Sequence, residues 1–310
     1  MRFVERSVLM LGAASIAASR ATQENAPSQR CGAVRQPKIA VCLAGGARTF
    51  AMPGVYERIG TNMIAALEAN VTTFLHLKLI DHSDKGGTAV ENIAHGVHHA
   101  DEVATRHAAR AIGGALGALD IVSADEGLYP RPMCAHGGGT VPNFTDSHMS
   151  WKLQEHWQML IAQIDSLRWC GDAIAAYELR TGVQFEYVIK SRPDLTPLTP
   201  LWPHCEMDLE FACQSRDWMF MLPGRAAIPA LRKGWERFQS CAKETQTLSQ
   251  GTSKMPIAES LVRGGMGAIL SPREKEKMPG QRPDINLRLQ RVPGAITGSP
   301  PGTIRGTCGW

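Results

Sequence analysis

The chain has 310 residues, of which 44% are hydrophobic and 20% charged, a composition typical of a globular protein with a substantial core. The formal net charge at pH 7 is +4 and the basic residues are scattered, so the Lys/Arg runs of nucleic-acid-binding proteins are lacking and no nucleic-acid partner is expected. A chain of this length is compatible with one large α/β unit.

The N-terminus has the layout of a secretory signal peptide. Two Arg residues in MRFVER precede the apolar and small residues of SVLMLGAASIAAS, and SRAT then offers small residues for cleavage. The apolar run is too short for a comfortable membrane span. Residues 1–21 are therefore predicted to be a signal peptide, or a short signal anchor where they stay uncleaved. An organelle transit peptide is the alternative, and residues 22–37 are predicted to be a polar linker.

The cysteines and the glycosylation sequons fit the secretory pathway. No C-x-x-C pair occurs, which argues against a zinc ribbon or a thioredoxin-type site. Eight cysteines allow about 105 complete pairings, so the sequence does not assign disulfides. Cys42 stands in an apolar run and is predicted to be buried and free. Sequons begin at Asn70 and Asn143, and the second lies in a Gly/Pro-rich loop. The cysteines are at positions 31, 42, 134, 170, 205, 213, 241 and 308.

The first part of the domain reads as a βαβ unit. In KIAVCLAGGARTF, residues 38–43 form a short apolar run that predicts a buried parallel strand ending at Gly45-Gly46. Apolar residues recur at helical spacing over residues 55–67, and VTTFLHLKLI predicts the second strand.

The rest of the chain continues the alternation of helices and strands. The clearest helix covers residues 150–181 and ends before Gly182, where glycine favours termination. FEYVI then predicts a buried strand, and the Pro-rich LTPLTPLWPHC after it predicts irregular structure. Together these elements predict an α/β fold with a mainly parallel open sheet and flanking helices. The other expected helices cover 99–118, 225–240 and 256–264; the other strands cover 121–124, 209–214, 218–222 and 267–270, with an edge strand at 285–292 and a Pro/Gly-rich tail at 293–310.

Charged residues follow two of the predicted strands. Ligands of such sheets bind beyond the carboxyl ends of the strands. The first strand is followed by Gly45-Gly46-Ala47-Arg48-Thr49, and the strand FEYVI is followed by Lys190-Ser191-Arg192-Pro193-Asp194. Arginine forks bind diphosphates bidentately, and a carboxylate can hold the divalent ion that bridges a diphosphate. The plainer alternative is that Arg192 and Asp194 pair only with each other and that Gly45-Gly46 is only a tight turn.

The same two segments carry a resemblance to a known family. KIAVCLAGGARTF resembles the motif "vClsGq.RtF" of a poorly characterised family of glycosyltransferase-like proteins, and EYVIKSRPDLTPL is similar to its "yd.vvr.RPDl...p". RDWMFMLPGRAA and PIAESLV are similar to later segments, so the resemblance covers residues 38–292. It implies one catalytic domain there, with the A-type nucleotide-diphospho-sugar transferase fold (GT-A), a nucleotide-sugar donor and Mn²⁺ or Mg²⁺ as cofactor.

The resemblance also implies roles for these residues. Gly45, Gly46 and Arg48 would line the nucleotide and its pyrophosphate, and Arg192 would neutralise charge on the departing nucleoside diphosphate. Asp194 stands where A-type transferases place the metal-binding acid of an Asp-x-Asp motif, and would hold the metal or a donor hydroxyl. The first acid of that motif is replaced here by Arg192, which departs from the family pattern.

Two further acids are candidates for the general base that deprotonates the acceptor hydroxyl, namely Asp217 and Glu259. Asp217 is equally compatible with a turn residue, and Glu259 with a solvated carboxylate in the first helical turn after Pro256.

Histidine and tryptophan residues offer weaker signals. The histidines lack the Glu of an H-E-x-x-H motif, so they are expected to form a surface cluster and not a metal site. The tryptophans are candidates for stacking on an acceptor sugar, although aromatic residues on a helix mostly belong to the core. No G-x-S-x-G elbow of a serine hydrolase occurs. These residues are His95, His98, His99 and His107, and Trp151, Trp157 and Trp169.

These observations predict a glycosyltransferase that moves a sugar from a nucleotide-sugar donor to a glycan or protein acceptor in the Golgi lumen or outside the cell. A catalytically inactive secreted module that binds carbohydrate or nucleotide with the same fold is the rival, and a structural organelle protein is a third interpretation. The sequence specifies neither the sugar nor whether the transfer inverts or retains the anomeric configuration.

Overall fold

The computed structural model describes residues 30–32, 35–81, 98–122, 150–215, 219–239, 287–291 and 303–306. The helix expected at 256–264 and the strand expected at 267–270 lie outside the described residues.

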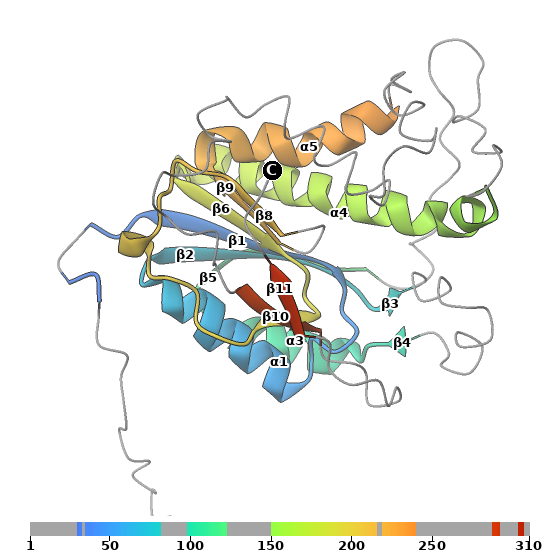
Figure 1. Ribbon diagram of the computed structural model, residues 1–310, viewed down its shortest axis with the longest axis horizontal. Coiled ribbons are helices and arrows are strands. Elements are labelled where there is room, and N and C mark those ends of the chain that lie inside the picture. Colours follow the sequence, from blue (N-terminus) through green and yellow to red (C-terminus); the bar gives the residue numbers. More distant parts are fainter. Residues whose placement is uncertain are drawn as a thin grey trace, which may run out of the picture.

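The core is a six-stranded sheet of order β5-β2-β1-β6-β9-β8 (Figure 1). Five strands run in the same direction, and β9, which pairs with β6 and β8, is antiparallel to them. The expected α/β fold with a mainly parallel open sheet is therefore confirmed, and the strand predicted first lies in the middle of the sheet. The strands are β1 (Lys38–Gly46), β2 (Asn70–Lys78), β5 (Ala115–Val122), β6 (Tyr187–Ser191), β8 (Cys213–Ser215) and β9 (Met219–Pro223).

Helices cover both faces of the sheet because strand side chains alternate between them. Ile39, Val41 and Leu43 of β1 pack with one group of buried residues, and Ala40 and Cys42 with another. The first face carries α1 (Pro53–Arg58), a π-helical turn (Ile59–Ile64), a 3₁₀ turn (Ala65–Leu67) and α3 (Glu102–Ala111). The second carries α4 (Ser150–Thr181) and α5 (Gly224–Gln239), which lie side by side (Figure 1). Helix α4 has the bounds expected from sequence.

The expected helix over residues 99–118 is wrong at its far end. Asp101 caps α3 by accepting the N–H of Ala104 at 2.7 Å, but the helix stops at Ala111. Gly113 and Gly114 follow with φ of +87° and +74°, which glycine adopts readily and which ends a right-handed helix. Strand β5 then begins at Ala115 and includes the first part of the short strand expected at 121–124.

The prediction of irregular structure after β6, which was based on the prolines of that segment, is wrong at its start. Leu195–Pro197 forms a short strand, β7, in a second sheet of order β11-β10-β7. Pro197 is tolerated because β7 lies at the edge of that sheet. β10 (Leu287–Arg291), expected as an edge strand, is the central one, and β11 (Thr303–Gly306) lies within the segment expected as a tail. Asn62 donates to the Pro197 carbonyl at 2.9 Å and joins β7 to the helical layer.

Smaller elements complete the described chain. The strand expected at 209–214 begins later, since Asp208 accepts the N–H of Glu210 at 2.9 Å in a turn before β8. β3 (Ile80–Asp81) pairs with β4 (His98–His99), and a 3₁₀ turn covers His204–Glu206.

Two disulfides tie these layers together. Cys42 of β1 is bonded to Cys170 of α4, so the prediction that Cys42 is buried is confirmed and the prediction that it is free is wrong. Cys31 is bonded to Cys205 in the 3₁₀ turn, and Cys213 is also disulfide-bonded. Disulfides fit a secreted or lumenal protein.

None of the helices in the described part of the chain contains a segment long and apolar enough to cross a bilayer. Asn70, the first sequon, is exposed at the start of β2, and Asn143 lies outside the described residues.

We predict that Gly224→Ala strongly destabilises the fold. A Cβ atom at Gly224 would lie 1.8 Å from the carbonyl oxygen of Phe185, while the Gly224 N–H bonds the Glu186 carbonyl at 2.9 Å, so α5 would have to move away from β6. The free energy of unfolding in urea should fall by about 3 kcal/mol or more. The control is Gly54→Ala, where a Cβ meets nothing within 4 Å, and its expected change is within about 0.5 kcal/mol. Equal stabilities of the two variants would contradict the packing of α5 on β6.

Candidate functional site

The chain changes direction across the sheet between β1 and β6. It runs from β1 outward to β2 and β5, and then returns through α4 to β6 on the other side of β1. The last β1–β6 pair in register is Leu43 with Ser191, so the loops that follow both strands leave the same edge of the sheet. In open α/β sheets this switch point is where ligands bind.

Three charged side chains from these two loops form one group, the Arg48–Asp194–Arg192 triad. Asp194 Oδ1 accepts Arg192 Nε at 2.9 Å, and Oδ2 accepts Arg192 Nη2 at 2.8 Å and Arg48 Nη1 at 3.2 Å. The Asp194 side chain is 2% exposed, that of Arg48 8% and that of Arg192 22%. The pairing of Arg192 with Asp194 that we considered as the plainer alternative does occur, but Arg48 joins it from the other strand.

Backbone conformation brings the two loops into contact. Gly45, with φ of +142°, lets β1 end against Pro193, whose Cδ would lie 3.4 Å from a Cβ at that position. Arg48 has φ of +29°, a region that non-glycine residues rarely adopt and that often marks functional sites. Gly45 and Gly46 are the last residues of β1, paired with Leu77 and Lys78, and so are more than a tight turn.

The electrostatics of the triad favour an ionised Asp194. Burial raises the pKa of this carboxyl, but the charges of Arg192 and Arg48 and their hydrogen bonds outweigh burial, so the net pKa lies below its ordinary value of 3.8. The triad therefore brings two guanidinium groups and one ionised carboxylate together at the strand ends. Such a site suits a phosphate-bearing anion.

Two buried hydroxyls lie close to the triad in sequence, one in the loop after β1 and one in β7. Thr49 follows Arg48, and Thr196 stands two residues after Asp194. Both side chains are buried, and in the described part of the chain neither Oγ1 has a hydrogen-bond partner. Buried hydroxyls are usually hydrogen-bonded, so these two Oγ1 atoms keep their capacity to donate to a ligand. Thr196 was not predicted as a site residue, because its segment was expected to be irregular and no strand orientation could be assigned to it.

The Asp194 carboxylate does not fit a divalent metal in this arrangement. Both oxygens already accept hydrogen bonds from guanidinium groups, whose charge repels a cation. Among the described residues, no group of three or more His, Cys, Asp or Glu side chains could hold a metal ion.

The other sequence candidates are only partly described. Asp217 and Glu259, the base candidates, lie outside the described residues, as does His95. The side chains of His98, His99, Trp151 and Trp157 are outside them too. His107 lies on α3 with its ring edge-on to Tyr56, at 6.3 Å between centroids.

Sequence reasoning missed a second polar group, on the α4 side of the sheet. His76 of β2 pairs with Asp120 of β5 through Nδ1 and Oδ2 at 2.8 Å, and its ring stacks on Trp169 at 5.0 Å. Burial and the nearby Lys78 lower the pKa of His76, against the opposing effect of Asp120. Trp169 therefore stacks on a histidine inside the protein. The register pair of His76 with Asp120 could not be read before the strand order was known.

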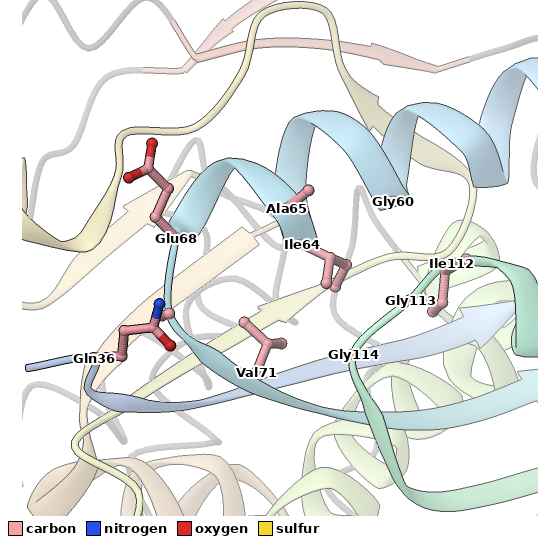
Figure 2. A pocket seen from close by; sticks show the side chains of 10 residues that line it. Gln36, Gly60, Ile64, Ala65, Glu68, Val71, Ile112, Gly113 and Gly114 are labelled. Atoms are coloured by element: carbon pink, nitrogen blue, oxygen red, sulfur yellow. The ribbon is translucent and has the colours of Figure 1, made fainter. Parts of the chain in front are cut away.

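A hollow of about 290 Å³ lies at the opposite edge of the sheet (Figure 2). Ile64, Val71 and Ile112 line it, and Gln36 and Glu68 contribute its polar atoms. Gln36 precedes β1 and Val71 is near the start of β2, so the hollow faces the amino ends of the strands. The Glu68 carboxylate there accepts the N–H groups of Arg30 and Cys31, both at 3.1 Å. This hollow is separate from the triad, and its charged group is a carboxylate and not a guanidinium.

Comparison of the chain with protein-family models finds no match, and comparison with curated proteins finds no relative.

We predict that Asp194→Asn destabilises the protein at neutral pH by about 3–5 kcal/mol, because it removes the buried carboxylate that pairs with two guanidinium groups. Since the pKa of Asp194 is lower in the folded state, its contribution is complete above the ordinary value of 3.8 and is lost as pH falls through the lower folded pKa. Urea unfolding from pH 8 to pH 3 should show a constant difference between the native protein and the variant that shrinks below about pH 4.

The control for this measurement is Asp172→Asn. Its carboxylate also contacts two arginines, Arg168 and Arg232, but is 44% exposed, so the cost should be about 1 kcal/mol or less. Similar losses in the two variants would contradict the buried triad.

Proposed function

We propose that this protein is a glycosyltransferase that takes a sugar from a nucleotide-sugar donor. The observation that carries the proposal is the convergence of Arg48 and Arg192 on Asp194 at the carboxyl ends of β1 and β6. A diphosphate needs fixed cationic donors at a strand edge, and two guanidinium groups held by one buried carboxylate meet that need.

The fold supports the same reading. Numbered along the chain, the six strands have the order 3-2-1-4-6-5, with only the sixth antiparallel. This mainly parallel sheet is compatible with the A-type transferase fold that the resemblance implies. The segments that carry the resemblance are β1 with its loop and β6 with its loop, which are the segments that meet at the triad.

The proposed reaction breaks the bond between the anomeric carbon and the β-phosphate oxygen, whose electron pair leaves with the nucleoside diphosphate. A new bond forms between the anomeric carbon and the oxygen of an acceptor hydroxyl on a glycan or protein. The hydroxyl proton passes to a carboxylate base, for which Asp217 and Glu259 are the proposed candidates. Arg192 and Arg48 stabilise the negative charge that develops on the leaving diphosphate.

The proposed setting is the secretory pathway, in the Golgi lumen or outside the cell. It is supported by the two assigned disulfides and by the N-terminal segment with signal-peptide features.

The proposal is tested with a panel of UDP-, GDP-, ADP- and CDP-sugars, by measuring binding and the release of nucleoside diphosphate with and without saccharide acceptors. We expect one donor to bind and to turn over. Arg192→Gln should lower kcat by about 10²–10³, since one preorganised donor to the developing charge is lost. Arg232→Gln, which removes a half-exposed guanidinium between α4 and α5, should leave turnover unchanged.

Binding of a donor without turnover under any of these conditions would favour the rival interpretation, a catalytically inactive module of the same fold. Failure of every donor to bind would contradict the proposal.

A further inference from the structure

We infer that the triad is a metal-independent diphosphate site, in which the guanidinium groups of Arg48 and Arg192 take the place of a divalent cation and Asp194 positions them. This inference rests on the proposed function and specifies how the donor is held.

The first argument is the saturation of Asp194. A Mg²⁺ or Mn²⁺ ion needs a carboxylate oxygen as a direct ligand at close range. In the triad, Oδ1 accepts one guanidinium N–H and Oδ2 accepts two, at 2.8 to 3.2 Å. A dication at either oxygen would have to displace these bonds and sit beside two positive charges in a buried site, where screening is weak.

The second argument is the difference in exposure between the two arginines. The Arg192 side chain is 22% exposed and that of Arg48 is 8% exposed. Arg192 donates two hydrogen bonds to Asp194, from Nε and Nη2, and this bidentate contact fixes the plane of the guanidinium group. Arg192, the more exposed of the two, would contact the diphosphate directly, and Arg48 would add charge from the second strand. Asp194 would contact the arginines and not the diphosphate, so it is a positioning residue.

The third argument comes from two hydroxyl groups that are close to the triad in sequence. Thr49 and Thr196 each bury an Oγ1 that has no hydrogen-bond partner in the described part of the chain. A hydroxyl can donate to a phosphate oxygen, and it is a weaker ligand for a hard dication than a carboxylate. Neutral donors next to the guanidinium groups in sequence therefore fit a phosphate anion better than a metal ion.

The test measures binding of UDP, GDP, ADP and CDP, and of inorganic pyrophosphate as a nucleoside-free probe, by calorimetry on the full chain. Each probe is titrated in EDTA and again in Mn²⁺. We expect the same Kd for the bound nucleotide in both conditions. Arg192→Gln should weaken binding about 10- to 100-fold through loss of a charge-assisted hydrogen bond, and Arg48→Gln should weaken it as well. Arg232→Gln is the control and should bind like the native protein.

The role of Asp194 has its own readout. Asp194→Asn, checked for folding by near-UV circular dichroism, raises the net charge of the site by one. Pyrophosphate binding in EDTA should then weaken about 10-fold despite the more positive charge, because the guanidinium groups lose the carboxylate that holds them in place. Binding by the folded variant that is as tight as that of the native protein, or tighter, would overturn the positioning role.

The remaining outcomes separate this inference from the proposed function. Binding of a nucleotide only in Mn²⁺ would overturn the inference and leave the proposed transferase intact. Binding in EDTA that neither arginine variant affects would also overturn it, because the diphosphate would then lie elsewhere. If no nucleotide and no pyrophosphate bind in either condition, both the inference and the proposed function are wrong.

Discussion

The buried carboxylate of Asp194 is the group on which the arrangement of the β1 and β6 loops depends. Desolvation makes a lone buried Asp194 unfavourable, so its ionised form requires the guanidinium groups of Arg192 and Arg48. Arg192 comes from the same loop, but Arg48 belongs to the loop after β1, 146 residues earlier in the chain. The ion pair of Arg48 with Asp194 therefore connects the loops at the carboxyl ends of β1 and β6. The Cys42–Cys170 disulfide, which ties β1 to α4, fixes the same strand from the face of the sheet.

The order of the strands in the sheet places these two strand ends at a potential ligand site, because the chain connections change direction at β1. The chain leaves β1 toward β2 and β5 and returns to β6 on the other side of β1. The loops after β1 and β6 therefore leave neighbouring strands in different directions. The positive φ of Arg48 and the close approach of Gly45 to Pro193 are local features that the meeting requires. At the opposite edge, the hollow between Ile64, Val71 and Ile112 is lined mainly by apolar side chains, with the Glu68 carboxylate among its polar groups.

Much of this arrangement was readable from sequence, for physical reasons that differ between residues. The apolar run before Gly45 and the run before Arg192 predicted buried strands, and parallel strands bring their carboxyl ends together, so Arg48 and Asp194 were expected to serve one binding site. The start of β5 was misread because Ala115 to Ala118 favours helices locally, whereas pairing with β2 decides its conformation. Cys42 was read as free because its partner lies 128 residues away and spacing gives no sign of it. The pairing of Thr196 with β10 and of His76 with Asp120 depends on strand order, which no local pattern encodes.

The central claim is that Arg48 and Asp194 interact across the two strand ends, and a double-mutant cycle tests it most directly. The free energies of unfolding are measured for the native protein, Arg48→Gln, Asp194→Asn and the double variant at pH 7. Contact through a buried ion pair predicts a coupling energy of about 1–3 kcal/mol, with the double variant less destabilised than the sum of the single ones. Additive losses within about 0.3 kcal/mol would mean that the two side chains do not interact, and would contradict the account.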